Sequence, residues 1–220
     1  MGPSIGAALS GVAPEGLEGG EPLMASPAPM LPPVSGEAPP SIYPADLFDR
    51  ALSSDENEPG RANWWILHTK SRQEKKVGEL LYSLSVPFYL PLLRCTSPSR
   101  GRTRTVWTPL FSGYVFLWGG DDERLAALKT NRLAAVHRVA DGTRLSRDLA
   151  GFASLIEKGA ALTPESRIVV GQSVRVKSGP FMGQEGIVMK RRGRTKLLIV
   201  LAEVLQGASM DIEDYLLEGI

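Results

Sequence analysis

The chain has 220 residues, with 25 basic and 24 acidic side chains, two histidines and one cysteine. Cys95 alone excludes an internal disulfide and suits a reducing compartment, and two histidines without further ligands exclude a credible metal site. No apolar run is long enough to span a bilayer, and the N-terminus lacks the basic start and apolar core of a signal peptide. We therefore expect a soluble, cytoplasmic, monomeric protein without metal or cofactor, built as one large domain or two small ones.

Charge is divided unevenly along the sequence. Residues 1–60 contain one basic residue against nine acids, a net charge of −8, and the remainder carries +9. Eleven of the seventeen prolines lie in residues 1–62, with many glycines and few aromatics, so this stretch cannot bury enough apolar surface to offset its ordering entropy. The composition predicts a disordered acidic extension over residues 1–62, and the basic remainder favours contact with a polyanion.

One apolar island interrupts this extension. Tyr43, Leu47, Phe48 and Leu52 follow Pro44 and would line one face of a short helix. The island is either a docking motif or a few hydrophobic residues in an unstructured tail, and so short a pattern favours the tail.

Regular patterns begin at Asn63. Residues 64–69 form an aromatic and aliphatic run of strand length, and Ser71 with Glu74 has the spacing of a capping box that starts a helix. Residues 86–93 predict a second strand, which its prolines place at an edge or an irregular position.

A polar loop with four arginines is predicted from Arg94 to Arg104. Residues 105–107 and 113–118 then predict two strands of a hairpin-like unit.

Two further helices are predicted, with Asp121 and Ser146 as their N-caps and a brief strand over residues 136–139 between them. The order of elements predicts a compact α+β domain over residues 63–158, in which helices pack on a largely antiparallel sheet. Residues 159–170 have the composition of an interdomain linker.

Short strands and glycine turns fill residues 171–220, and no helix of ordinary length is needed there. This pattern predicts a small all-β barrel.

Three segments resemble the NusG family of transcription elongation and antitermination factors. Residues 64–67 with the basic helix after them resemble the opening of the NusG N-terminal domain, and residues 100–116 resemble its most characteristic segment, closest to RfaH-like specialised paralogs. Residues 174–188 resemble a KOW motif in an SH3-like barrel. The resemblance covers residues 63–220 and implies a polymerase-binding α+β domain followed by an SH3-like KOW barrel.

The resemblance implies a mechanism without bond chemistry. The N-terminal domain of the family binds the clamp helices of RNA polymerase and disfavours pausing, which requires an apolar patch with aromatic anchors. The other interpretation of these aromatics is sheet core, which must hold for some of them, and strand alternation puts Tyr114 and Phe116 on one face. By position in the family motif, the candidate anchors are Phe111, Tyr114 and Phe116, with Trp65 and Leu110 as neighbours.

Basic residues form a second set of candidates. Positions like Lys70, Lys76 and Arg132 resemble those through which RfaH-like paralogs touch non-template DNA, and Arg72 lies beside them. A solvated helix face explains Lys76 equally well, and nascent RNA is a further possible partner.

The barrel of the family contacts a ribosomal protein and, in housekeeping members, the termination factor Rho. Leu205 falls in the matching loop and is the candidate contact, although the aromatic common there in housekeeping members is missing. The basic residues in 190–196 would meet ribosomal RNA or form a solvated turn.

Several alternatives remain open. The Arg-rich loop and the acidic extension favour a specialised antiterminator over a housekeeping factor, and a ribosome-associated KOW protein is a different class. No enzyme motif occurs in the sequence. RfaH also rests with its C-terminal domain as a helical hairpin, but Ile199 and Val200 here favour strands.

Overall fold

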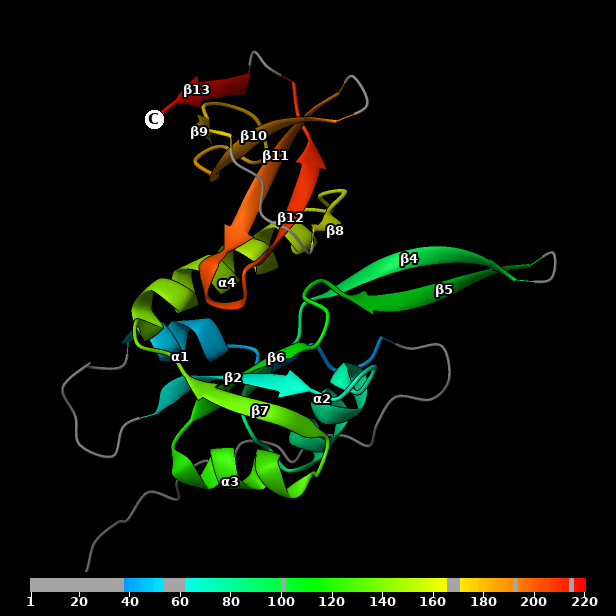
Figure 1. Ribbon diagram of the computed structural model, residues 1–220, viewed down its shortest axis with the longest axis vertical. Coiled ribbons are helices and arrows are strands. Elements are labelled where there is room, and N and C mark those ends of the chain that lie inside the picture. Colours follow the sequence, from blue (N-terminus) through cyan, green and yellow to red (C-terminus); the bar gives the residue numbers. More distant parts are fainter. Residues whose placement is uncertain (1–37, 54–61, 100–101, 166–170, 192–193, 214–215) are drawn as a thin grey trace, which may run out of the picture.

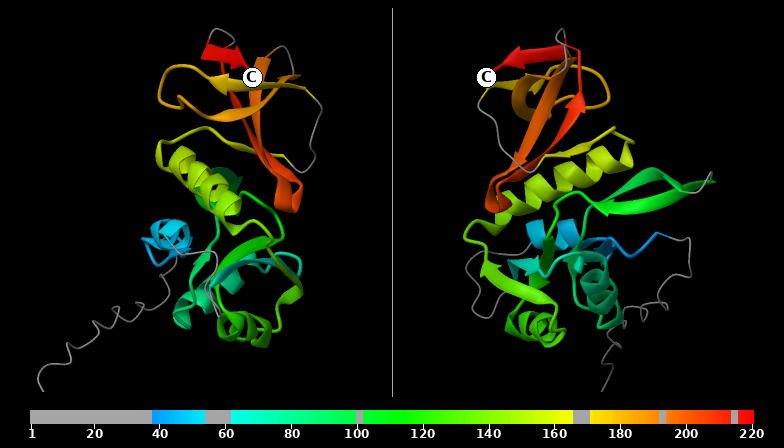
Figure 2. Two further views of the ribbon diagram at one scale, coloured as in Figure 1. Left: turned by 90° about the vertical axis from the view of Figure 1, so that its left-hand side faces the viewer. Right: turned by 45° about the vertical axis from the view of Figure 1, so that its right-hand side comes forward.

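The computed structural model has two antiparallel sheets with helix α4 (Gly142–Glu157) between them (Figure 1). Two further views show the same layering and a long two-stranded arm that extends to one side (Figure 2). The structure describes residues 38–53, 62–99, 102–165, 171–191, 194–213 and 216–220.

The first sheet has five strands in the order β1-β3-β6-β2-β7, and every pairing is antiparallel. The central pair is β2 with β6, which places Ile66 opposite Phe116 and His68 opposite Tyr114. The strands are β1 (Ile42–Tyr43), β2 (Asn63–Thr69), β3 (Phe88–Tyr89), β6 (Tyr114–Gly119) and β7 (Leu133–Arg138).

Successive side chains of a strand point to opposite faces of a sheet, and both faces of this sheet are covered by helices. Leu67 and Leu117 pack in one core with α2 (Glu74–Ser83) and α3 (Asp121–Lys129). Trp64, Ile66 and Phe116 pack in a second core with α1 (Leu47–Ser53) and α4. The predicted α+β domain with an antiparallel sheet and packed helices is confirmed.

Three predicted N-caps are wrong. Helix α3 begins at Asp121, and its N-cap is Gly120. Helix α2 is capped by Gln73, not by Ser71, because the Glu74 carboxylate accepts a hydrogen bond from the Gly113 backbone instead of closing a capping box. Helix α4 begins at Gly142, and its N-cap Asp141 accepts from the Arg144 backbone.

Ser146, the predicted cap of that helix, lies inside it and is completely buried. Its hydroxyl accepts a 2.7 Å hydrogen bond from Trp64 Nε1 and donates to the Gly142 carbonyl oxygen. The hydroxyl therefore satisfies the buried indole of the central strand.

The predicted arginine loop is a β-ribbon. Strand β4 (Leu92–Ser99) pairs along its whole length with β5 (Arg102–Pro109), from Leu92 opposite Pro109 to Ser99 opposite Arg102. Strand β5 therefore pairs with β4, whereas β6 pairs with β2 and β3, and the predicted pairing of β5 with β6 is wrong. We call this ribbon the arm.

The second sheet has six strands in the order β13-β9-β10-β11-β12-β8. Its described residues are strands apart from a short 3₁₀ helix, η1 (Ala202–Val204), and loops, and a helical hairpin does not form. The strands are β8 (Thr163–Glu165), β9 (Gln172–Val176), β10 (Glu185–Arg191), β11 (Arg194–Leu201), β12 (Gln206–Asp211) and β13 (Leu217–Gly219).

The predicted linker, residues 159–170, contributes to this sheet. Strand β8 lies within it and pairs with β12, and the Ser209 hydroxyl donates to Glu165 Oε1 at 2.8 Å. Part of the predicted linker is therefore strand, and its residues 166–170 lie outside the described part.

The predicted disorder over residues 1–62 is wrong for residues 38–53. Leu47 is completely buried, and the Phe48 ring packs 5.0 Å from Tyr89 and 6.4 Å from Trp64. Strand β1 pairs with β3, so the segment closes the sheet edge before its helix reaches α4. The apolar island docks on its own domain because the sheet supplies the aromatic partners that a short helix lacks alone.

No helix among the described residues is long and apolar enough to cross a bilayer.

We expect Leu47→Ala to lower the free energy of unfolding by about 2–5 kcal/mol, the usual cost of emptying a buried leucine site. Leu52→Ala, on the same helix but 44% exposed, is the matched control and should change it by about 0.5 kcal/mol or less. Urea denaturation measures both, and equal effects would contradict the docking of α1.

Candidate interaction site

A tight turn at residues 111–113 joins the arm to strand β6; it contains Phe111 and lies between Leu110 and Tyr114. Gly113 has φ = 86°, a conformation that favours glycine, and the Tyr114 amide closes the turn by donating to the Phe111 carbonyl oxygen. The Gly113 amide donates to Glu74 Oε1 at 2.8 Å, and its carbonyl oxygen accepts from the Thr69 amide. Helix α2 and strand β2 therefore fix the turn from both sides.

Tyr114 follows this turn as the first residue of β6, the middle strand of the sheet. Its ring stacks on His68 directly across β2 and β6, with 5.1 Å between centroids and 20° between planes. Both side chains are half-buried. His68 is a site residue that the sequence analysis missed, because the signal is its cross-strand register with Tyr114, which only the sheet pairing reveals.

Three of the five candidate anchors lie in the core. Leu110 is 1% exposed, and Phe111 and Phe116 are completely buried. The Phe111 ring makes edge contacts with Phe116 at 5.8 Å and with Phe152 of α4 at 5.0 Å. In this arrangement the three side chains support Tyr114 from behind, and their contact with a partner stays a prediction.

Trp65 lies on the opposite face of the sheet from Tyr114. Its Nε1 donates to the Gly119 carbonyl oxygen at 2.9 Å, and the Arg124 guanidinium carbon lies 5.3 Å from the ring centroid. The structure therefore does not bring Trp65 together with the other candidates.

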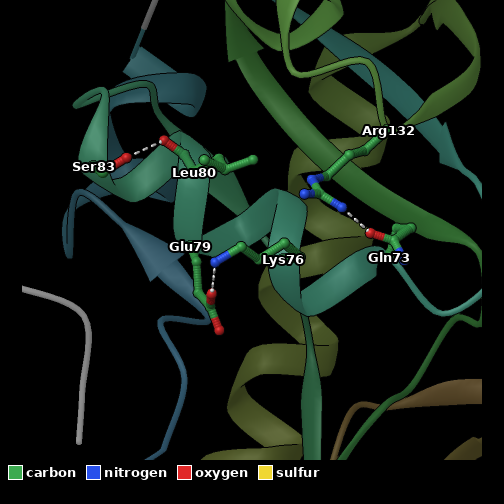
Figure 3. Close-up of polar contacts among 6 residues, drawn as sticks. All are labelled: Gln73, Lys76, Glu79, Leu80, Ser83 and Arg132. Atoms are coloured by element: carbon green, nitrogen blue, oxygen red, sulfur yellow. Dashed lines mark hydrogen bonds and ion pairs between the residues drawn. The ribbon is translucent and has the colours of Figure 1, made fainter.

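The basic candidates Lys70 and Arg132 lie together where β2 ends and β7 begins. The Lys70 amide donates to the Arg132 carbonyl oxygen, and Lys70 Nζ donates to the Asn131 carbonyl oxygen at 2.8 Å. Arg132 Nη1 donates to Gln73 Oε1, as Figure 3 shows. Arg72 is exposed in the same β2–α2 loop, with φ = 58°.

Lys76 lies one turn further along α2 and is partly neutralised. Its Nζ lies 3.0 Å from Glu79 Oε2, and the lysine side chain is 53% exposed (Figure 3). An exposed pair of this kind contributes little to stability. The structure therefore gathers Lys70, Arg72 and Arg132 into one basic cluster, with Lys76 at its margin.

Leu205 lies at the turn between η1 and β12. It is 68% exposed and has φ = 51°, an uncommon conformation for a leucine. The next residue, Gln206, donates from Nε2 to the Ser112 carbonyl oxygen at 3.2 Å. The candidate contact of the second sheet therefore lies next to the turn that carries Tyr114.

Helix α4 also meets the second sheet through two carboxylates. Burial raises the pKa of Asp148, and the nearby charge of Glu203 raises it further, against the lowering effect of Arg144 and Arg147. Glu203 Oε2 is itself buried without a hydrogen-bond partner. The two like charges therefore weaken the contact between α4 and the second sheet when the pH is above the usual pKa range of aspartate.

Three features of this region are of a kind found at binding surfaces: an aromatic pair at the end of the β2–β6 pair, a basic cluster and an exposed apolar turn. Among the described residues no group of three His, Cys, Asp or Glu side chains is placed to hold a metal ion. Residues 62–145 match the family model described as Transcription termination factor nusG. The match spans less than half of the chain, and no curated protein matches it.

The matched residues include β2, α2, the arm, β6, α3 and β7, and with them the turn and the basic cluster. This match supports the NusG resemblance of the first domain, and with it a role in transcription. Family proteins of this kind bind RNA polymerase.

We expect Glu74→Ala to lower the free energy of unfolding by about 1.5–3 kcal/mol, because it removes a charge-assisted hydrogen bond to the part-buried Gly113 amide. Glu79→Ala, on the exposed face of the same helix, should change it by about 0.5 kcal/mol or less. Chemical denaturation measures the difference. Equal losses would mean that Glu74 does not hold the turn.

The raised pKa of Asp148 predicts a pH dependence of stability. The folded state holds the proton more tightly than the unfolded state, so the penalty is absent at low pH and grows as pH rises through the folded pKa. Asp148→Asn should therefore raise the melting temperature at pH 7 by roughly 1–3 °C, since water still screens this partly exposed group.

The gain should shrink as pH falls toward the ordinary aspartate range, and melting curves across pH measure it. Asp122→Asn, at an exposed position on α3, serves as the control. A gain for Asp148→Asn that is independent of pH would contradict the electrostatic cause.

Proposed function

We propose that this protein is a cytoplasmic transcription elongation or antitermination factor. Its first domain docks on the clamp helices of RNA polymerase and suppresses pausing or termination, and an RfaH-like specialised role at particular operons is our preferred form. The observation that carries the proposal is the family match over residues 62–145, which contains the fixed turn bearing Tyr114. No bond chemistry is involved.

The exposed part of the docking surface is the stacked pair of Tyr114 and His68. An aromatic residue that is half-exposed yet held on two sides is suited to a binding hot spot, because little side-chain entropy remains to be lost on binding. Leu110, Phe111 and Phe116 act from behind this surface, where they fix the angle of β6 to α4. Trp65 would contribute from the other face.

The basic cluster is our candidate surface for nucleic acid held by the polymerase, either non-template DNA or nascent RNA. Arg72 is exposed, Lys70 lies in the same loop, and Arg132 lies in the neighbouring α3–β7 loop, where its carbonyl oxygen accepts from the Lys70 amide. Phosphate contacts by these side chains would make binding dependent on salt. Lys76 would join the cluster after release from its exposed pairing with Glu79.

The second sheet is our candidate for the SH3-like KOW barrel of the family, with Leu205 as its contact to a ribosomal protein or Rho. An exposed leucine in a strained turn supports a binding role, since nothing in the folded chain requires it there. A housekeeping factor coupled to Rho or the ribosome, and a ribosome-associated KOW protein, are the alternatives.

We expect Tyr114→Ala to weaken binding to RNA polymerase by about tenfold or more and to abolish the change in pausing, because truncating a hot-spot aromatic commonly costs over 1 kcal/mol. His68→Ala should have a smaller effect in the same direction. The measurement is in vitro transcription with the cognate polymerase, with and without Rho, together with a direct binding titration.

Tyr82→Ala is the matched control, since Tyr82 is a half-buried tyrosine on α2 that packs against Tyr43, away from the turn. It should leave binding unchanged. If the wild-type protein alters neither elongation nor termination, the proposal fails. A response that requires Rho would favour the housekeeping alternative over the specialised antiterminator.

A further inference from the structure

The arm lies in the longest part of the chain without acidic residues. No Asp or Glu occurs between Glu79 and Asp121, whereas four arginines are concentrated between residues 94 and 104. The structure describes the side chains of Arg94 and Arg104, and both are exposed. Positive charge on the arm is therefore unopposed by carboxylates of its own strands.

Stability does not explain the outer part of the arm. Leu92 and Leu93 at its base are buried, but Cys95, Thr96 and Thr105 beyond them are exposed. The arm extends away from both sheets (Figures 1 and 2). An isolated two-stranded ribbon gains little from its own pairing, so a long polar ribbon beyond the core indicates a contact with something outside the chain.

The register gives both faces of the arm a positive charge. Arg94 lies opposite Trp107, while Arg104 lies opposite Ser97, three residues further along β4. Because side chains alternate between faces, an odd separation puts the two arginines on opposite faces. A flat protein surface would use one face, whereas a groove with charged walls would use both.

The dimensions of the arm fit a nucleic-acid groove. Each strand has eight residues, which corresponds to roughly 27 Å at the rise of an antiparallel strand. The major groove of B-form DNA is about 12 Å wide and admits a two-stranded ribbon, with phosphates along both walls. The deep, narrow major groove of A-form RNA does not admit side chains in this way.

We propose that the arm binds double-helical DNA by entering its major groove, with Arg94 and Arg104 contacting the phosphates of opposite walls. Hydroxyl side chains between the two arginines, such as Thr96 and Thr105, add neutral donors to phosphate oxygens. The contact reads charge and groove shape. It needs no polymerase, and it is separate from the basic cluster at Lys70 and Arg132.

The base of the arm is held firmly enough to transmit such a contact. Lys75 of α2 donates from Nζ to the Trp107 carbonyl oxygen at 3.1 Å, and the half-buried Trp107 ring packs against the core beneath α2. The arm therefore enters a groove as an extension of the first domain, and its angle is set by α2.

The test compares two double variants of the full chain with the same change in charge. Arg94→Gln with Arg104→Gln removes the proposed contacts. Arg138→Gln with Arg144→Gln removes two exposed arginines from the end of the first domain opposite the arm, at the end of β7 and the start of α4. Circular dichroism and tryptophan emission confirm that both variants keep the fold.

Fluorescence anisotropy measures binding to a labelled DNA duplex without polymerase, at salt concentrations between about 50 and 200 mM. For the arm variant we expect weaker binding, and a slope of log affinity against log salt that is smaller by roughly 2, because two phosphate contacts are lost. The control variant should keep the wild-type slope.

Three results would overturn the proposal. These are no binding of duplex DNA by the wild-type protein, an equal loss of affinity in the two variants, or a loss in the arm variant that is confined to single-stranded RNA. The first result leaves polymerase docking through Tyr114 untouched, since that surface does not include the arm. A transcription defect of Tyr114→Ala together with unchanged duplex binding would separate the two surfaces.

Discussion

Helix α4 must pack against two sheets at once, and the rest of the structure depends on this constraint. Leu145, Leu149 and Phe152 form the buried stripe, and Phe152 meets Phe111 under the first sheet. Asp148 and Gly151 lie near Glu203 and Gln184 of the second sheet. Five of its sixteen residues are buried, Arg144, Arg147 and Glu157 are exposed, and Asp148 is half-buried beside the second sheet. Its polar positions therefore decide how firmly the second sheet is held.

The same helix determines which aromatics remain available. Trp64, Phe111 and Phe116 all point toward α4 and are buried where the helix packs on the sheet. The Ser146 hydroxyl accepts the hydrogen bond of the Trp64 indole. Tyr114 shares their face but lies at the end of its strand, where it is half-buried and its ring stacks on His68. The aromatic residues of this face that can contact a partner are therefore those that the core does not bury.

Much of the first domain could be predicted because its signals are local. Strand alternation correctly placed Tyr114 and Phe116 on one face, and the helical spacing of apolar residues located α2 and α4. The helix starts were wrong where a distant partner changed the outcome: Glu74 bonds to Gly113, which is 39 residues away, and Ser146 to Trp64 across 82 residues. Capping patterns cannot include partners from another strand, and the same limit applies to the pairing of His68 with Tyr114.

The island at residues 42–52 and the arm are opposite cases of one rule. The island has too few apolar residues to fold alone. It becomes ordered because its strand β1 pairs with β3 and its Phe48 ring packs against Trp64 and Tyr89. The arm has ample pairing, but the described side chains of β4 beyond Leu93, from Arg94 to Thr96, are exposed. Composition alone predicted irregular structure for both segments, because it counts apolar residues and does not show which other residues they can contact. Whether a segment with few hydrophobic residues becomes ordered therefore depends on whether the neighbouring domain has an unpaired strand edge or an uncovered apolar face. Residues 42–52 find both and complete the core, whereas the arm extends outward.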